Sequence, residues 1–545
     1  MTSHPSGVSV EQLLSRARKA RKDGAASEAA DLAAHAVKIA PTRADAWYVF
    51  AAAQRDATQF DGADKAYLRT LELIPIGGAQ HSPLGVKIML DRLAVLLAAG
   101  KWRAAAEQAD AIARTGTLKA KDHNALSAAY AQIMLFEPAR HHAEQAVRLT
   151  PEDAAAHYNL ATVQRYLGQS NAAKSSYRRV IAVQPNHIQA HAALTALYSA
   201  KEAAQQIEPL ARLRARAAPQ SRDLARVHHA LFKAFDAAGD TEAAWSELEA
   251  GARIMHAMAP PNLEATEALY NALTSAAEAV PPSPARHLES NPRPIFIVGL
   301  PRSGTTLVET ILSAHSQVDA LGETPALEIT LRAQLDAPPP NPLTPKNVHA
   351  LTALSAPEVA SGYLTEISYL ARSGMYATDK RLRNYEYCPF IKYAMPDSRI
   401  VHVRRSPMDT LFSCFRMQFG ADFHWSYEFD ALAQQYRLYR QLMKTWRTQL
   451  GEDLIEVWLE DIIRAPDVEI RRLLKALHLP FEAACLAPHT IAGGVSSASA
   501  TQVRQPIHAA GVDAWRKYAK QLAPLQRRLQ TQGYVSHDGA AIRAD

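Results

Sequence analysis

The chain has 545 residues, of which 48% are hydrophobic and 21% charged, so it is long enough for two or more globular domains. Sixty basic residues against 54 acidic ones leave a net charge of +6, and without a concentrated basic stripe we expect no nucleic-acid partner. No apolar run approaches the roughly 20 residues of a membrane-spanning helix. The first residues also lack the apolar core of a signal peptide, so we expect a cytoplasmic protein.

Cysteine usage agrees with a reducing compartment. Cys388, Cys414 and Cys485 lie far apart and in no spacing typical of metal ligands. We interpret them as packing residues and expect no metal site.

The first half of the chain contains an internal repeat. Segments 41–75 and 151–185 each begin and end with prolines 34 positions apart. They have identical residues at several matching positions, among them Tyr48 and Tyr158, Ala51 and Ala161, Ala63 and Ala173, and Tyr67 and Tyr177. Small residues where two helices cross, aromatic residues at helical spacing and a closing proline resemble the tetratricopeptide repeat.

This resemblance implies an all-α solenoid over residues 10–278, in which each helical hairpin buries its apolar face against its neighbours. The repeated aromatic residues are then core residues, and the number of repeats stays open. A solenoid surface is a common place to hold a peptide or protein partner. Residues 279–293 are rich in proline and polar residues, and we interpret them as a linker to a second domain at 294–535.

The second domain opens with PIFIVGLPRSGTTL, residues 294–307, which predicts a strand followed by a phosphate-binding turn. Gly299, Gly304 and Thr306 have the spacing of an ATPase P-loop, but Thr305 replaces its lysine. Backbone amides at a helix N-terminus still bind an anion without that lysine. We therefore expect an anion other than a nucleoside-triphosphate tail, with Arg302 adding positive charge.

The sequence after this loop alternates between patterns typical of helices and patterns typical of strands. We predict a helix from Thr306 to about His315 and strands at residues 399–403 and 454–459. Such alternation indicates an α/β fold with a parallel sheet, helices on both faces and ligands at the carboxyl ends of the strands.

The loop resembles the 5′-phosphosulfate loop of sulfotransferases, which use 3′-phosphoadenylyl sulfate (PAPS). The second half resembles the tetratricopeptide-containing bacterial branch of that family, and its active-site pattern is similar to that of protein-tyrosine sulfotransferases. The resemblance implies that the 5′-phosphate and sulfate are held, without a metal, by Pro301, Arg302, Ser303, Gly304, Thr305 and Thr306.

Three further motifs carry the resemblance. An arginine at a strand end and a serine eight residues later hold the 3′-phosphate in the family, and Arg405 and Ser413 have that spacing. Strand alternation should point the neighbouring Arg404 elsewhere. Glu323, in the sequence GET, corresponds to the general base, and Lys380 to the lysine that stabilises the leaving group.

A C-terminal segment corresponds to the part that folds over the cofactor in this branch, with Ser499, Gln502, Val503 and Arg504 at its core. Two positions depart from the family pattern. Leu382 stands where the family has proline, although Asn384 remains, and Leu459 stands where a tyrosine is common. These departures put the shape of the acceptor loop and one contact to the nucleotide in doubt.

The resemblance implies transfer of a sulfuryl group from PAPS to a hydroxyl, with a tyrosine of a peptide or protein as the favoured acceptor, held with help from the solenoid. A carbohydrate, lipid or small phenol is an alternative acceptor. A nucleoside-triphosphate enzyme with a degenerate loop and a non-catalytic solenoid scaffold are alternative functions. The oligomeric state stays open, with a dimer as one option.

Overall fold

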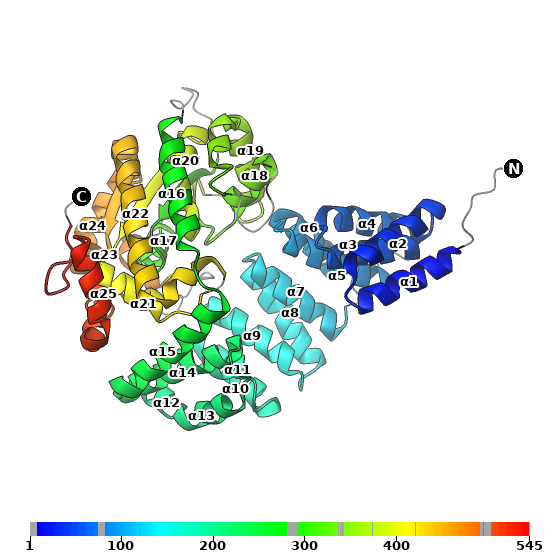
Figure 1. Ribbon diagram of the computed structural model, residues 1–545, viewed down its shortest axis with the longest axis horizontal. Coiled ribbons are helices and arrows are strands. Elements are labelled where there is room, and N and C mark those ends of the chain that lie inside the picture. Colours follow the sequence, from blue (N-terminus) through cyan, green and yellow to red (C-terminus); the bar gives the residue numbers. More distant parts are fainter. Residues whose placement is uncertain are drawn as a thin grey trace. The chain divides into compact units, whose positions relative to one another are not determined.

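The computed structural model describes residues 8–74, 82–116, 118–280, 291–335, 337, 343–372, 374–419, 421–490, 494 and 503–543. The chain divides into two compact units, residues 1–163 and 164–545. Each unit is described by itself below, with the element labels of Figure 1.

The first unit consists of antiparallel helical hairpins. Its helices are α1 (Val10–Lys22), α2 (Ala26–Ile39), α3 (Ala44–Asp56), α4 (Phe60–Leu73), α5 (Pro83–Ala98), α6 (Trp102–Ala113), α7 (Ala120–Gln132) and α8 (Phe136–Leu149). Alanines at the helix crossings are fully buried, and the Tyr48 and Tyr67 rings pack edge to face with centroids 6.0 Å apart. The repeated aromatic residues are therefore core residues, and the predicted solenoid fold is confirmed.

Helical hairpins continue into the second unit. These helices are α9 (Ala154–Tyr166), which crosses the unit boundary, α10 (Ser170–Val183), α11 (Ile188–Leu197), α12 (Ala200–Ala204), α13 (Ile207–Arg216), α14 (Arg222–Ala238), α15 (Thr241–Met258) and α16 (Leu263–Glu278). Most of the predicted linker, residues 281–290, lies outside the described residues. The domain limits inferred from the sequence remain predictions.

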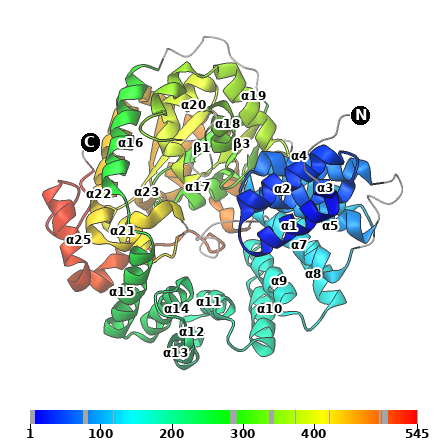
Figure 2. The same ribbon diagram turned by 45° about the vertical axis from the view of Figure 1, so that its right-hand side comes forward.

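A parallel sheet follows, with strand order β2-β3-β1-β4-β5. The strands are β1 (Arg293–Val298), β2 (Val318–Ala320), β3 (Tyr376–Asp379), β4 (Arg399–Arg404) and β5 (Leu454–Trp458). Strands β1, β4 and β5 lie where the sequence predicts them, whereas the short β2 and β3 were not predicted. Because all pairs are parallel, the carboxyl ends of the strands share one edge of the sheet, near the start of α17 (Figure 2).

Helices cover both faces of this sheet. The α-helices are α17 (Thr305–Leu312), α18 (Ala326–Leu335), α19 (Ala356–Ile367), α20 (Cys388–Ala394), α21 (Pro407–Phe415), α22 (Phe429–Leu450), α23 (Leu459–Arg464), α24 (Pro466–Ala476) and α25 (Ala519–Thr531). The short 3-10 helices are η1 (Val348–Ala353), η2 (Leu382–Tyr387), η3 (Ala421–Tyr427), η4 (Gly451–Asp453), η5 (Ala483–Leu486), η6 (Pro488–Thr490) and η7 (Ala514–Tyr518). Successive side chains alternate between faces, so Ile295 and Ile297 pack toward α17 and α24, while Phe296 and Val298 join the core that includes α22.

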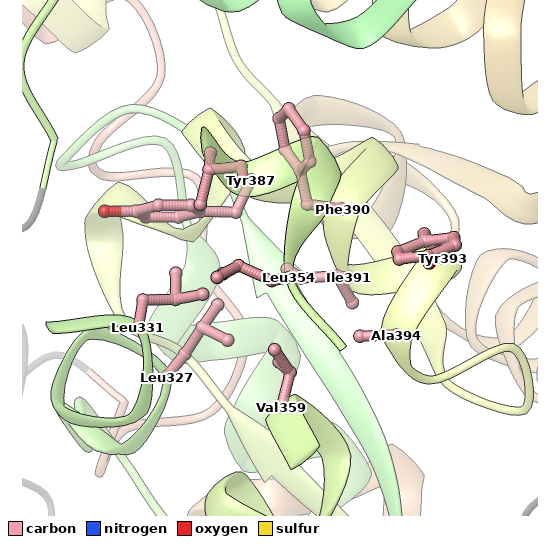
Figure 3. A pocket seen from close by; sticks show the side chains of 10 residues that line it. Leu327, Leu331, Leu354, Val359, Tyr387, Phe390, Ile391, Tyr393 and Ala394 are labelled. Atoms are coloured by element: carbon pink, nitrogen blue, oxygen red, sulfur yellow. The ribbon is translucent and has the colours of Figure 1, made fainter. Parts of the chain in front are cut away.

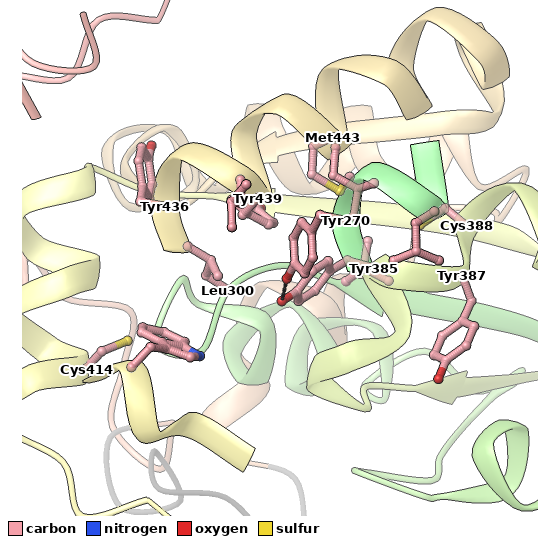
Figure 4. Packing of buried hydrophobic residues seen from close by; sticks show 14 of the residues in the cluster. Tyr270, Leu300, Tyr385, Tyr387, Cys388, Cys414, Tyr436, Tyr439 and Met443 are labelled. Atoms are coloured by element: carbon pink, nitrogen blue, oxygen red, sulfur yellow. Dashed lines mark hydrogen bonds between the residues drawn. The ribbon is translucent and has the colours of Figure 1, made fainter. Parts of the chain in front are cut away.

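The last repeat helices share that second core. Tyr270 on α16 and Tyr385 on η2 meet with their hydroxyl oxygens 2.6 Å apart (Figure 4). The Gln435 amide donates a hydrogen bond of 2.8 Å to the Tyr270 hydroxyl. Helix α16 also packs along α22, as Figures 1 and 2 show. Within the second unit, repeat helices and sheet are one continuous structure.

Two other features of the described residues bear on the sequence analysis. None of their helices has the length and apolar character needed to cross a membrane. The three cysteines are free thiols buried in the protein, which agrees with a packing role.

Candidate active site at the carboxyl ends of the strands

The loop between β1 and α17 is shaped by two glycines that leave no room for a side chain. A Cβ on Gly299 would lie 2.6 Å from the Val403 carbonyl oxygen, and one on Gly304 would lie 2.8 Å from Cδ1 of Leu459. Gly304 also has φ of 106°, which favours glycine. The loop thus packs closely against β4 and the start of α23 and leads into the N-terminus of α17, where the helix amides attract anions.

The predicted phosphate clamp is brought to this loop. Arg405 donates from Nη1 to the Arg302 carbonyl oxygen at 2.9 Å and from Nη2 to the Gly511 carbonyl oxygen. Arg302 in turn donates from Nε to Oγ of Ser413, on α21, at 2.9 Å. Burial, with Arg416 and Arg405 nearby, lowers the pKa of Arg302 to about 10. A site where arginines crowd together in this way is suited to an anion.

Polar atoms left without partners mark where a ligand fits. Ser303 Oγ and Arg405 Nε are buried and make no hydrogen bond to any of the described residues. Buried polar groups are rarely left unpaired in folded proteins. The residues present therefore fit a nucleotide phosphate held by the loop and by Arg405.

Arg404 points to the other face of the sheet, as strand alternation predicts. Its guanidinium lies 4.4 Å from the centre of the Trp458 ring and pairs with Glu456 at 3.3 Å. The Arg404 guanidinium is therefore engaged by Glu456 and Trp458, although Arg404 lines the same small pocket as Ser303 and Arg405.

Glu323 and Lys380 meet at the ends of β2 and β3. Lys380 donates from Nζ to Glu323 Oε1 at 2.8 Å. The lysine side chain is 1% exposed, whereas that of Glu323 is 28% exposed. Burial alone would lower the pKa of Lys380, but the carboxylates of Glu323 and Glu309 outweigh it and raise that pKa. The arrangement places a charged lysine beside a carboxylate that solvent or a substrate can reach.

Glu309, on α17, is a site residue that the sequence analysis missed. Its Oε2 lies 3.8 Å from Lys380 Nζ, and its Oε1 accepts hydrogen bonds from the Gly322 amide at 3.0 Å and the Thr378 hydroxyl at 3.1 Å. Burial raises the pKa of Glu309. The sequence feature that could have indicated Glu309 is that it is the single carboxylate in the otherwise apolar helix TTLVETIL. Glu309 ties the turn that carries Glu323 to the strand that carries Lys380.

The structure also explains the two departures from the family pattern. Asn384 donates from Nδ2 to Asp379 Oδ1 at 2.8 Å even though Leu382 precedes it, so the turn after β3 keeps its anchor. Burial raises the pKa of Asp379 to about 7. Leu459 packs on Gly304, so it supports the loop by apolar contact.

The C-terminal segment is described in part. Ser499 and Gln502 lie outside the described residues. Val503 is buried, and Arg504 lies against the turn between α9 and α10, where its Nε would be 2.7 Å from a Cβ on Gly168. Lys517 donates to the carbonyl oxygen of Asp236, on α14, at 2.9 Å. The C-terminal segment thus contacts both the clamp, through Gly511, and the repeat helices.

A second concave feature of this unit has different chemistry. A small pocket of about 10 Å³ lies between α18, α19 and α20 and is lined mainly by aliphatic and aromatic side chains such as Leu327, Val359 and Phe390 (Figure 3). It carries no charged group, so it does not suit a phosphate or sulfate.

Comparisons with known proteins agree with this geometry. A sequence model described as the sulfotransferase family matches residues 294–483. The second half of the chain carries a sulfotransferase-family domain. A tetratricopeptide-repeat model matches residues 154–187, which span α9 and α10.

Two relatives are similar to parts of this chain. An "Uncharacterized protein" of Aquifex aeolicus is 28% identical over 246 residues, which are 44% of this chain and 32% of that protein. This chain therefore spans about a third of that relative's length. A "Putative protein-tyrosine sulfotransferase" of Caenorhabditis briggsae is 27% identical over 232 residues, 41% of this chain and 80% of that protein.

Solved structures similar to the repeat part are tetratricopeptide proteins. YrrB, described as having an unusual peptide-binding site, shows 17% identity and a TM-score of 0.28 over 40% of this chain and 97% of its own. A protein from Parabacteroides merdae shows 14% identity and a TM-score of 0.36 over 46% of this chain and 94% of its own. At these TM-scores the similarity carries no further argument.

Proposed function

We propose that this protein transfers a sulfuryl group from PAPS to a hydroxyl, and that its acceptor is a tyrosine of a peptide or protein. The observation that carries the proposal is the convergence of Arg302, Arg405 and Ser413 on the loop of a sulfotransferase-family domain, beside the Glu323–Lys380 pair. The two arginines and the serine are suited to bind the nucleotide, and the Glu323–Lys380 pair is suited to catalyse the transfer.

On the nucleotide side, the loop residues 301–306 would hold the 5′-phosphate and sulfate. Arg405 and Ser413 would hold the 3′-phosphate, with the buried and unpaired Nε of Arg405 as one donor. The cosubstrate supplies an activated sulfuryl group, whose bond to the nucleotide phosphate breaks as the acceptor oxygen bonds to sulfur.

On the catalytic side, Glu323 acts as the general base. Its Oε1 accepts from Lys380, while its Oε2 makes no hydrogen bond to any described residue and is available to take the acceptor proton. Lys380 holds a positive charge next to that carboxylate and stabilises negative charge as it develops on the departing oxygen. Neither role requires a metal.

The acceptor proposal has separate support. The Caenorhabditis briggsae relative bears the name of a tyrosine-sulfating enzyme. In the repeat part of the second unit, a cleft of about 470 Å³ is lined by apolar side chains together with polar and cationic ones, among them Arg178, Tyr198 and Arg212. We propose that the repeats hold the acceptor chain there. A cytoplasmic location also remains part of the proposal.

The proposal is tested by calorimetry with the full chain and the product nucleotide, adenosine 3′,5′-bisphosphate (PAP). PAP should bind at least about tenfold more tightly than ATP with Mg²⁺. The loop lacks the lysine that binds the triphosphate in a P-loop, and Arg405 would bind a 3′-phosphate, which ATP does not have. Equal affinity for the two nucleotides, or tighter binding of ATP, would contradict a PAPS site.

A further inference from the structure

Helix α14, the first helix of the last repeat hairpin, lies against the proposed nucleotide site. Asp236 on this helix accepts a hydrogen bond of 2.6 Å from the Tyr518 hydroxyl, and Phe232 packs on the Tyr518 ring with centroids 6.1 Å apart. Tyr518 packs in turn on Phe412 of α21, with centroids 5.3 Å apart. Phe412 precedes the clamp residue Ser413, so α14 and the clamp share one packed layer.

Lys233 follows Phe232 on the same helix and has no partner of opposite charge. The side chain is partly buried, and it makes no hydrogen bond or ion pair with any of the described residues. The charges that act on it are those of Arg416, Arg302 and Arg165, all positive. Burial first, and these arginines second, lower the pKa of Lys233 to about 8.

Other groups around Lys233 give it no compensation. His229, one turn earlier on α14, is partly buried, and burial together with Lys233 and Arg416 lowers its pKa, which favours the neutral ring. The carboxylates near Arg416 are already engaged: Asp236 by Lys517 and Tyr518, and Asp409 by backbone amides of the C-terminal segment. Lys233 and these arginines form a cationic cluster, and the desolvated Lys233, which has no ion pair with any described residue, is costly unless an anion joins it.

The position of the cluster relative to the strands indicates which anion it would bind. Arg302 bonds Ser413, and Arg405 follows β4, whereas Glu323 and Lys380 follow β2 and β3 on the other side of β1. The cluster therefore lies on the side of the clamp and away from the acceptor chemistry. A phosphate with two negative charges matches a cluster of this charge.

We infer that Lys233 of the repeat helix α14 contacts the 3′-phosphate of the bound nucleotide together with Arg405 and Ser413, and makes the enzyme specific for a 3′-phosphorylated donor. This inference rests on the proposed function. It assigns to the repeats a second role besides holding an acceptor, because the nucleotide site is incomplete without α14.

The test compares Lys233→Met, Lys233→Arg and Lys201→Met in the full chain, by calorimetry with PAP and with AMP, which lacks the 3′-phosphate. Lys201 is an exposed lysine on α12 and serves as the matched control. Lys233→Met should weaken PAP binding by roughly tenfold or more, the loss expected for one charge-assisted hydrogen bond, and leave AMP binding unchanged. Lys233→Arg should retain most of the PAP affinity, and Lys201→Met should retain all of it.

Thermal unfolding of the free proteins separates binding from folding. Because Lys233 is a desolvated charge without a partner, Lys233→Met should keep or raise the melting temperature. Unchanged PAP affinity, equal losses for PAP and AMP, or a lowered melting temperature would each overturn the inference. If the wild-type chain bound no PAP at all, the proposed function itself would fail, and that result is distinct from any of these.

Discussion

Glu309 shows how one buried side chain sets the geometry of the proposed catalytic pair. It touches neither the acceptor proton nor the nucleotide in our account, but it holds the Gly322 amide and lies 3.8 Å from Lys380 Nζ. We regard it as a positioning residue that also raises the pKa of Lys380.

Glu309→Gln should therefore change the pH profile of the reaction as well as its rate. Losing this carboxylate removes one of the three carboxylates, those of Glu323, Glu309 and Asp379, that raise the pKa of Lys380 against burial, so that pKa should fall. If charged Lys380 is required, the alkaline limb of kcat/KM should move to lower pH, with PAP affinity unchanged.

The matched control is Glu358→Gln, the same change at an exposed position of α19. It should leave the profile where it is. A Glu309→Gln enzyme whose alkaline limb stays in place would show that Glu309 does not act through Lys380.

The β1–α17 loop shows how an element is specified jointly by its own sequence and by distant packing. The motif PRSGTT predicts the turn, but its fit depends on Leu459, which lies 155 positions after Gly304 and packs on it. Leu459, a departure from the family pattern, thus supports the loop.

Gly304→Ala should lower both stability and PAP affinity. A methyl group there would lie 2.8 Å from Leu459 Cδ1 on a backbone with φ of 106°, and strain of this kind costs on the order of 1–3 kcal/mol. Thermal unfolding and calorimetry measure the two effects.

Gly451→Ala is the control, because Gly451 has φ of 53° but nothing within 4 Å of a Cβ. It should lower stability without changing PAP affinity. Adding Leu459→Ala to Gly304→Ala should relieve part of the loss. A Gly304→Ala protein with wild-type PAP affinity would contradict the assignment of this loop to the nucleotide.

At the scale of the whole molecule, the sequence predicts what is local and misses what depends on distant contacts. The repeat, the loop and the pair Arg405 and Ser413 are short linear patterns, and the fold they predict is confirmed. The strands β2 and β3 have only three and four residues and carry polar side chains, so their periodicity gave no signal.

Lys233 could not be found in this way for a different reason. In the sequence it is one lysine among many in the repeat helices. Its proposed role depends on the nearby arginines on α9, on the loop and at the end of α21, which only the fold brings together. The shared core of α16, η2 and α22 likewise joins segments that the sequence separates by a proline-rich stretch. Long-range packing of this kind makes the last repeats part of the sulfotransferase unit.

The central claim is sulfuryl transfer from PAPS with Glu323 as base, and radiolabelled PAPS tests it most directly. The full chain and its Glu323→Gln variant would be incubated with a library of random peptides that carry one fixed tyrosine, and with a matched library that carries phenylalanine instead. We expect label on the tyrosine library alone. The Glu323→Gln variant should transfer label at a rate that is lower by about 10²-fold or more, with unchanged PAP affinity. A wild-type chain that binds PAP but labels no hydroxyl, or a Glu323→Gln variant with full activity, would contradict the account.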